Sequence, residues 1–85
     1  MLVAEVIGNV VSTRKNELLV GCKFLNVRLL VPIAGLPSEI VAVDNIGAGL
    51  GEKVLVVVGS AARRAVGENL PVDAAVVGII DPVHE

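Results

Sequence analysis

The glycine-rich segment at residues 47–51, Gly-Ala-Gly-Leu-Gly, is the part of the chain that most resembles a phosphate-binding loop. Such loops bind phosphate when their backbone N–H groups face the anion and a helix begins directly after them. A Gly-x-Gly-x-x-Gly motif would need its third glycine one residue after Gly51, and the Lys-Ser/Thr of a Walker A loop is absent. A strand-like run, Lys53–Val58, follows instead of a helix. We therefore interpret the segment as a loop with positive φ values and a close backbone approach to another chain.

The nucleophilic and metal-binding side chains form no pattern typical of an active site. The chain has one histidine, His84, and one cysteine, Cys22, whereas a zinc site needs three or four clustered ligands. A cysteine nucleophile needs an oriented base, and His84 stands one residue from the end of the sequence, where a side chain is poorly held. We expect Cys22 to be a buried or half-buried free thiol. No catalytic, cofactor-binding or metal-ligating residue is predicted.

The remaining charged residues favour structural roles. Asp44, Asp73 and Asp81 each begin or end a strand-like run, where short carboxylates cap turns. The pair Arg63-Arg64 could bind an anion, but a solvated helix face or a salt bridge across an interface is the interpretation we favour.

The composition excludes several classes of protein and indicates an oligomer. The chain has 85 residues, of which 54% are hydrophobic and 19% charged, so it carries more apolar side chains than one small core can hide. A subunit interface is the expected place for the surplus. The net charge of −2 gives no electrostatic footprint for nucleic acid, and the apolar runs are too short to span a membrane. One cysteine suggests a reducing compartment, and the start of the sequence has no basic region typical of a secretion signal.

Glycines and prolines separate short apolar runs, which is typical of a small all-β domain. We expect strands at residues 2–13, 18–20, 24–31, 39–44, 53–58 and 74–80, and one short helix near residues 60–66 with Ser60 as its N-cap. Five or six strands and one helix predict a single domain over residues 1–85. Its expected fold is a small five-stranded barrel resembling the oligonucleotide-binding fold.

Side-chain alternation predicts which strand faces form the core. Leu2, Ala4, Val6, Gly8 and Val10 share one face of the first strand, and Leu25, Val27, Leu29 and Val31 share one face of the third. The runs at 39–44 and 53–58 are apolar on both faces, so we expect a barrel interior on one side and a neighbouring subunit on the other.

Three motifs in a fixed order resemble one known family. They are Val-Asp-Asn-Ile-Gly-Ala-Gly-Leu-Gly-Glu at 43–52, Gly-Ser-Ala-Ala-Arg at 59–63 and Pro-Val-Asp-Ala-Ala-Val-Val-Gly-Ile-Ile-Asp at 71–81. The chain resembles the EutN/CcmL family, the vertex proteins of bacterial microcompartment shells. The resemblance implies a cyclic pentamer that caps the fivefold vertices of a shell in the cytoplasm and packs against hexameric facet proteins. It implies a structural protein, with no enzymatic activity and no cofactor.

The resemblance also implies which residues contact neighbouring shell subunits. These are Gly47, Ala48, Gly49, Gly51, Glu52, Gly59, Ser60, Ala62 and Arg63. Two other classes remain as alternatives. A small oligomeric barrel that binds single-stranded nucleic acid would need stacking aromatics, but the chain has one Phe and no Trp or Tyr. An enzyme subunit with a site between chains would need paired titratable groups, which the sequence does not offer.

Overall fold

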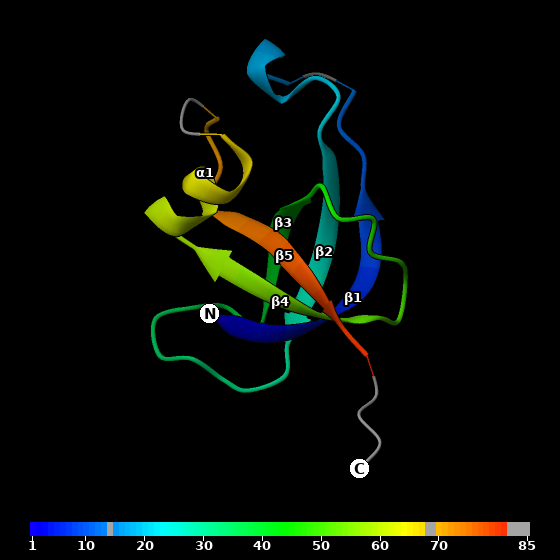
Figure 1. Ribbon diagram of the computed structural model, residues 1–85, viewed down its shortest axis with the longest axis vertical. Helices are drawn as coiled ribbons and strands as arrows, with labels where there is room; N and C mark the ends of the chain where they lie inside the picture. The colour runs from blue at the N-terminus through cyan, green and yellow to red at the C-terminus, as the bar shows by residue number, and fades with distance from the viewer. Residues whose placement is uncertain (14, 68–69, 82–85) are drawn as a thin grey trace.

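The barrel is built from five strands whose order around the wall is β1-β2-β3-β5-β4, with β4 pairing again with β1 (Figure 1). The computed structural model describes residues 1–13, 15–67 and 70–81. The strands are β1 (Leu2–Val10), β2 (Lys23–Leu29), β3 (Glu39–Asp44), β4 (Lys53–Val58) and β5 (Ala74–Ile80). One helix, α1 (Ser60–Val66), connects β4 to β5 and packs against the ends of both strands. The predicted five-stranded barrel with one short helix is confirmed.

The barrel closes where β3 meets β5, and this is its shortest seam. All other neighbouring strands are antiparallel, whereas β3 and β5 are parallel and pair through Val43 with Ala75 and Asp44 with Val76. The seam therefore lies at the end of β3, directly before the glycine-rich loop.

The core is formed by the inward-facing side chains of all five strands. Leu25 and Val27, which share the predicted face of β2, are fully buried, and so are Val54 and Val56 of β4. The buried cluster comprises Ala4, Val6, Leu25, Val27, Leu29, Ala42, Ala48, Val54, Val56, Ala74 and Val76.

The first strand departs from the predicted alternation after its middle. The pairing of β1 with β2 shifts register between Val6 and Gly8, which is a bulge or a local irregularity. Ala4 and Val6 are buried, but Gly8 and Val10 beyond the shift are partly exposed, so their assignment to the core was wrong. The strand ends at Val10 rather than near residue 13.

The predicted bounds of β3, β4 and β5 are confirmed, whereas two earlier segments differ. The run at residues 18–20 is not a strand, because Glu17–Leu19 forms a 3₁₀ helix, labelled η1. Asn16 caps it by accepting a 2.9 Å hydrogen bond from the backbone N–H of Leu18, a local bond that competes with strand pairing. The second strand ends at Leu29, and Val31 is exposed beyond its end.

Ser60 is the first residue of α1 and not its N-cap. Gly59 occupies the N-cap position with φ 68° and ψ −143°, and no side chain caps the helix. A glycine suits this place because a side chain would strain a backbone with positive φ.

Candidate subunit-contact site

The 45–52 loop, which connects β3 to β4, is shaped at its start by one buried carboxylate. Asp44 is the last residue of β3, and its side chain is fully buried. Its Oδ1 accepts from the backbone N–H of Ile46 at 2.9 Å and of Gly47 at 3.1 Å, and its Oδ2 accepts from Ala48 at 2.8 Å. The expectation that Asp44 caps a turn is confirmed.

Lys23, at the start of β2, connects this carboxylate to the middle of the loop. The β2–β3 register places Lys23 opposite Asp44, and its Nζ lies 3.6 Å from Asp44 Oδ2. The same Nζ donates a 3.0 Å hydrogen bond to the carbonyl oxygen of Ala48. One ammonium group therefore neutralises the buried carboxylate and holds a loop carbonyl at the same time.

The far end of the loop is closed by Glu52. Its Oε1 accepts from the backbone N–H of Gly49 at 2.6 Å, and its own N–H donates to the Gly49 carbonyl oxygen at 3.1 Å. The loop is also attached to β1, because Gly51 N–H donates to the Val6 carbonyl at 2.8 Å and Val6 N–H donates to the Glu52 carbonyl at 2.9 Å. The backbone of the loop is thus fixed at both ends and along its length.

The side chains of the loop divide into a buried anchor and an exposed apolar surface. Ala48 is 1% exposed and belongs to the barrel core, whereas Leu50 is 77% exposed and Ile46 is also exposed. Gly47 and Gly51 have positive φ values, 100° and 84°, which let the backbone turn sharply at these two positions. The loop therefore presents leucine and isoleucine to its surroundings on a rigid backbone.

The second predicted segment, residues 59–63, lies at the other end of β4. Gly59 N–H donates a 2.8 Å hydrogen bond to the Asp73 carbonyl, which joins the start of α1 to the chain just before β5. Ser60 is exposed and Arg63 half-buried, while Ala62 is fully buried in its own domain. Ala62 and Ala48 can therefore contribute to a subunit contact through their backbone, because their side chains face inward.

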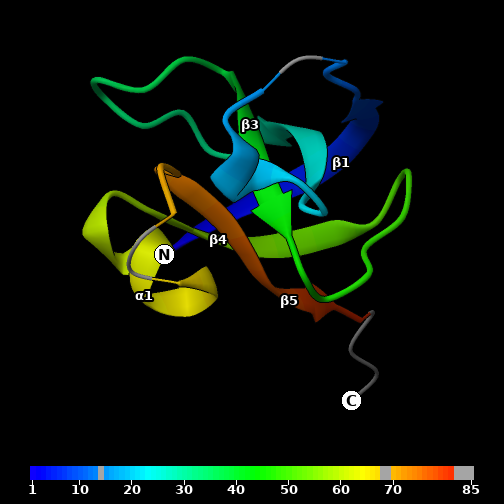
Figure 2. The same ribbon diagram turned by 90° about the horizontal axis from the view of Figure 1, so that it is seen from above.

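The two segments are not brought together within one chain. Figures 1 and 2 show the 45–52 loop and α1 on opposite sides of the barrel. Beside Gly59 is a separate groove of about 570 Å³, which the 32–38 loop and the adjoining ends of β3, β4 and β5 form together. The nine candidate residues thus belong to two surfaces that face in different directions.

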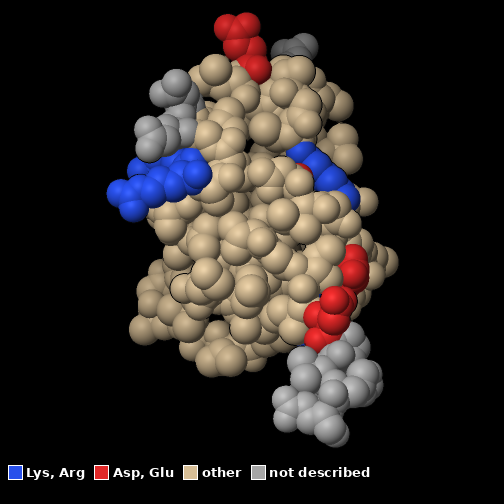
Figure 3. Space-filling model, in the orientation of Figure 1, with Lys and Arg blue, Asp and Glu red and all other residues tan. Residues whose placement is uncertain are grey.

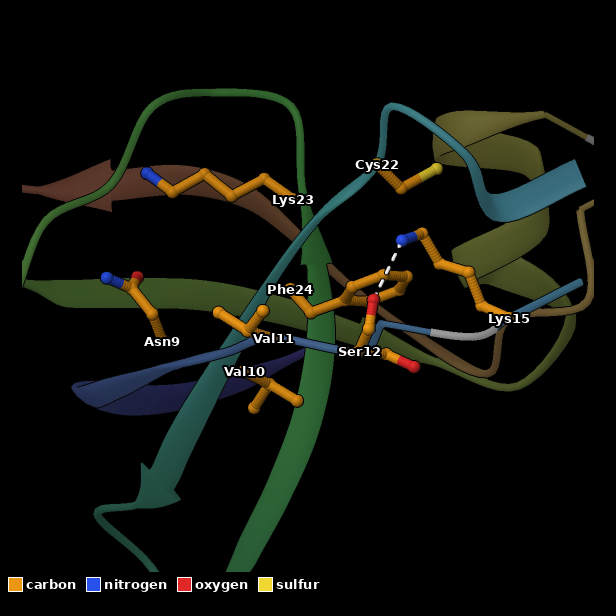
Figure 4. A pocket seen from close by; sticks show the side chains of 8 residues that line it. All are labelled: Asn9, Val10, Val11, Ser12, Lys15, Cys22, Lys23 and Phe24. Carbon is orange, nitrogen blue, oxygen red and sulfur yellow. Dashed lines mark hydrogen bonds between the residues drawn. The ribbon is translucent and has the colours of Figure 1, made fainter. Parts of the chain in front are cut away.

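A recess of about 340 Å³ near Cys22 contains the side chains most capable of chemistry outside these segments (Figure 4). Cys22 is half-buried and not in a disulfide, as expected for a free thiol. Lys15 Nζ donates to the Ser12 carbonyl oxygen at 3.0 Å, and Lys23 is engaged by Asp44. Among the described residues no three His, Cys, Asp or Glu side chains cluster as metal ligands, and His84 lies outside them.

Apolar side chains remain on the surface of the single chain, as the composition predicted. Figure 3 shows a broad area of the drawn face with few charged side chains, which gather toward its edges. Within the described residues no helix is long and apolar enough to cross a membrane. Among the residues that the structure describes, the exposed large hydrophobic ones are Met1, Val3, Val11, Leu18, Val20, Leu30, Val31, Ile33, Val41, Ile46 and Leu50.

Three residues of this site were not predicted from the sequence. Lys23 supports the loop, and Ile46 and Leu50 form its exposed apolar surface. Ile46 and Leu50 lie within the glycine motif, so their place in the motif could have identified them. Lys23 is far from Asp44 in sequence, and no local signal indicates that the two residues pair.

The structure thus defines a class of protein: a small closed barrel with an apolar surface and a rigid glycine loop. The family described as "Ethanolamine utilisation protein EutN/carboxysome" matches residues 1–81. The chain belongs to this EutN/CcmL family.

Relatives across the chain's whole length have one stated role. The bacterial microcompartment shell vertex protein GrpN of Rhodospirillum rubrum is 52% identical, over 99% of this chain and 97% of GrpN. The carboxysome shell vertex protein CcmL of Gloeobacter violaceus is 51% identical, over 98% of this chain and 85% of CcmL. The solved structure described as the GrpN pentameric microcompartment shell protein has a TM-score of 0.82 at 47% identity, covering 100% of this chain and 99% of that one.

Proposed function

We propose that this chain is a structural shell protein that forms a cyclic pentamer and caps the fivefold vertices of a bacterial microcompartment. Its relatives are shell vertex proteins, and one of the solved structures most similar to it is described as pentameric. The protein works by assembly and not by catalysis, and its location is the microcompartment shell. Residues 1–85 form one vertex domain in this proposal.

A cyclic pentamer needs two different patches on each chain, because each copy contacts the next one head to tail. The barrel offers apolar side chains on several sides, including Val3 on β1 and Val41 on β3. Burying such side chains against a neighbour gives about 25 cal/mol per Å² of apolar surface removed from water. The exposed apolar surface of the single chain is the structural observation that best supports assembly.

We further propose that the pentamer packs against hexameric facet proteins. The contact residues in this proposal are the two predicted segments, Gly47, Ala48, Gly49, Gly51 and Glu52 in the loop and Gly59, Ser60, Ala62 and Arg63 at the start of α1. Because the segments face in different directions, one chain can contact more than one neighbour. The rigid backbone of the loop suits a shell subunit that must contact its neighbours in a fixed geometry.

Co-expression with a hexameric facet protein tests this function. Closed polyhedral particles that contain this chain are expected, and omission of the chain should leave shells open at their vertices. Particles that close equally well without the chain would contradict the proposal. Electron microscopy and the protein composition of purified particles give both results.

The nucleic-acid alternative is not favoured. Barrels of this shape that bind single strands use aromatic side chains and a basic groove. This chain has one Phe, no Trp or Tyr and a net charge of −2. A gel-shift assay with a single-stranded oligonucleotide at low salt should show no complex.

A further inference from the structure

The first half of the glycine loop owes its shape to two residues outside the predicted contact segments. Asp44 accepts hydrogen bonds from three successive backbone N–H groups, those of Ile46, Gly47 and Ala48. Hydrogen bonds to an ionised carboxylate are stronger than those between neutral groups. Three of them in one turn define the path by which the chain leaves β3.

Lys23 adds a connection between the loop and a neighbouring strand. Its Nζ contacts both Asp44 Oδ2 and the carbonyl oxygen of Ala48, at 3.6 and 3.0 Å. The side chain of Lys23 is 49% exposed, so it crosses the surface of the barrel rather than filling its core. We call the two side chains together the Lys23–Asp44 clasp.

The clasp orders the first half of the loop, which carries the exposed Ile46 and leads into Leu50. The Ala48 N–H is the last of the three that Asp44 binds, and Leu50 follows two residues later with its side chain in solvent. An apolar side chain on a mobile loop loses conformational entropy when it binds a neighbour, whereas one on a fixed loop has already lost it. The clasp therefore lowers the entropic cost of any contact that the loop makes.

We propose that Lys23 and Asp44 are positioning residues for shell assembly. They hold the first half of the 45–52 loop in the conformation in which the exposed Ile46 and Leu50 contact the neighbouring shell subunit. Neither residue has to touch the neighbour, because each acts through the loop backbone. This inference rests on the proposed shell function and adds the residues that prepare its contact loop.

Two substitutions loosen the clasp in different ways. Asp44→Asn replaces one acceptor oxygen by an NH₂ donor, which cannot accept from a backbone N–H. Lys23→Met keeps an unbranched side chain that is one atom shorter, and it removes the ammonium group with its charge and both polar contacts. Lys15→Met is the matched control, since Lys15 is exposed and makes its hydrogen bond outside the loop. Lys23→Arg is the conservative variant expected to restore the contacts.

Hydrogen exchange and assembly are measured on the same full-length variants. Amide exchange at Ile46, Gly47 and Ala48 should become about tenfold faster in Asp44→Asn and Lys23→Met, while core amides such as Val27 and Val54 stay protected. The yields of pentamer and of closed shells with a facet protein are then compared. At least one yield should fall about tenfold in both variants, as expected when roughly 1.4 kcal/mol of contact energy is lost. Lys15→Met and Lys23→Arg should behave like the unmodified chain.

Four results would overturn the inference. Unchanged exchange in the loop would mean that the clasp does not hold it, and faster exchange with normal assembly would mean that loop shape is irrelevant. A global loss of protection in both variants would show a role in folding instead of positioning. If the unmodified chain itself forms neither pentamers nor closed shells, the proposed function fails first and the inference fails with it.

Discussion

Gly49 and Glu52 close the glycine loop on itself, with the Gly49 N–H donating to Glu52 Oε1 at 2.6 Å and the Glu52 N–H donating to the Gly49 carbonyl at 3.1 Å. A Cβ atom added to Gly49 would lie 3.3 Å from that same Oε1. The position has room for hydrogen but not for a larger group without movement of the Glu52 carboxylate. This relationship explains why glycine and glutamate occur together in the loop, and it makes the loop sensitive to small changes.

Gly49→Asp should leave the barrel folded while abolishing shell closure. The new carboxylate would stand beside that of Glu52, and repulsion between like charges would displace the loop, which lies outside the hydrophobic core. We expect a loss of about 1–2 kcal/mol in the free energy of unfolding, with unchanged circular dichroism. Gly49→Ala is the matched control, since it adds a Cβ without charge and should have a milder effect. Closed shells of normal shape from Gly49→Asp would contradict the assigned role of the loop.

Leu50→Asp should weaken assembly and leave the stability of the folded domain almost unchanged. The Leu50 side chain is mostly in solvent in the single chain, so its replacement is expected to change the free energy of unfolding by at most about 0.5 kcal/mol. In a shell contact that buries Leu50, the same change would remove a charge from water at an energetic cost. Leu50→Met, which keeps the apolar volume, should assemble normally. Sedimentation of shells formed by each variant measures the difference, and equal assembly of both variants would exclude Leu50 from the interface.

Arg63→Glu should weaken assembly more than it destabilises the domain. Arg63 and Arg64 both lie in the last turn of α1, where a negative charge opposes the helix dipole by about 0.3–1 kcal/mol. Arg64→Glu is a matched control, because it makes the same charge change one residue away, on an exposed side chain. A selective effect of Arg63→Glu on shell yield would support a contact role. A large fall in melting temperature with normal assembly would indicate a structural role within the chain instead.

Leu25→Ala should destabilise the barrel itself. Leu25 is fully buried among the inward side chains of the barrel, and removing such a side chain typically costs about 2–5 kcal/mol. Leu18→Ala, at an exposed position of η1, should cost less than about 0.5 kcal/mol. Denaturant unfolding at one fixed protein concentration compares the two, because dissociation makes the apparent stability concentration-dependent. Similar losses in the two variants would mean that the core is wrongly assigned.

The sequence predicts the barrel well where an apolar run is bounded on both sides by residues typical of turns. The bounds of β3, β4 and β5 follow from that pattern alone. The prediction is wrong at residues 18–20, because three apolar residues are equally compatible with a strand and a short helix. The hydrogen bond from Leu18 N–H to the Asn16 side chain favours the helix.

The contact loop could be predicted from its sequence motif, but the pairing of Lys23 with Asp44 that holds it could not. Asp44 adjoins the glycines and is typical of a turn cap, so its role follows from local spacing. The pairing of Lys23 with Asp44 depends on the register of β2 against β3, which a single sequence does not encode locally. For the same reason the sequence could not show that the two contact segments lie on opposite sides of the barrel.

The number of copies in the assembled protein tests the central claim most directly. Native mass spectrometry at micromolar concentration should give five copies of the 8.7 kDa chain, about 43–44 kDa in total, as expected for a closed ring. That mass would support the vertex-cap function. A monomer or dimer as the only species would contradict it, because the exposed apolar surface would then remain uncovered by a ring of neighbours.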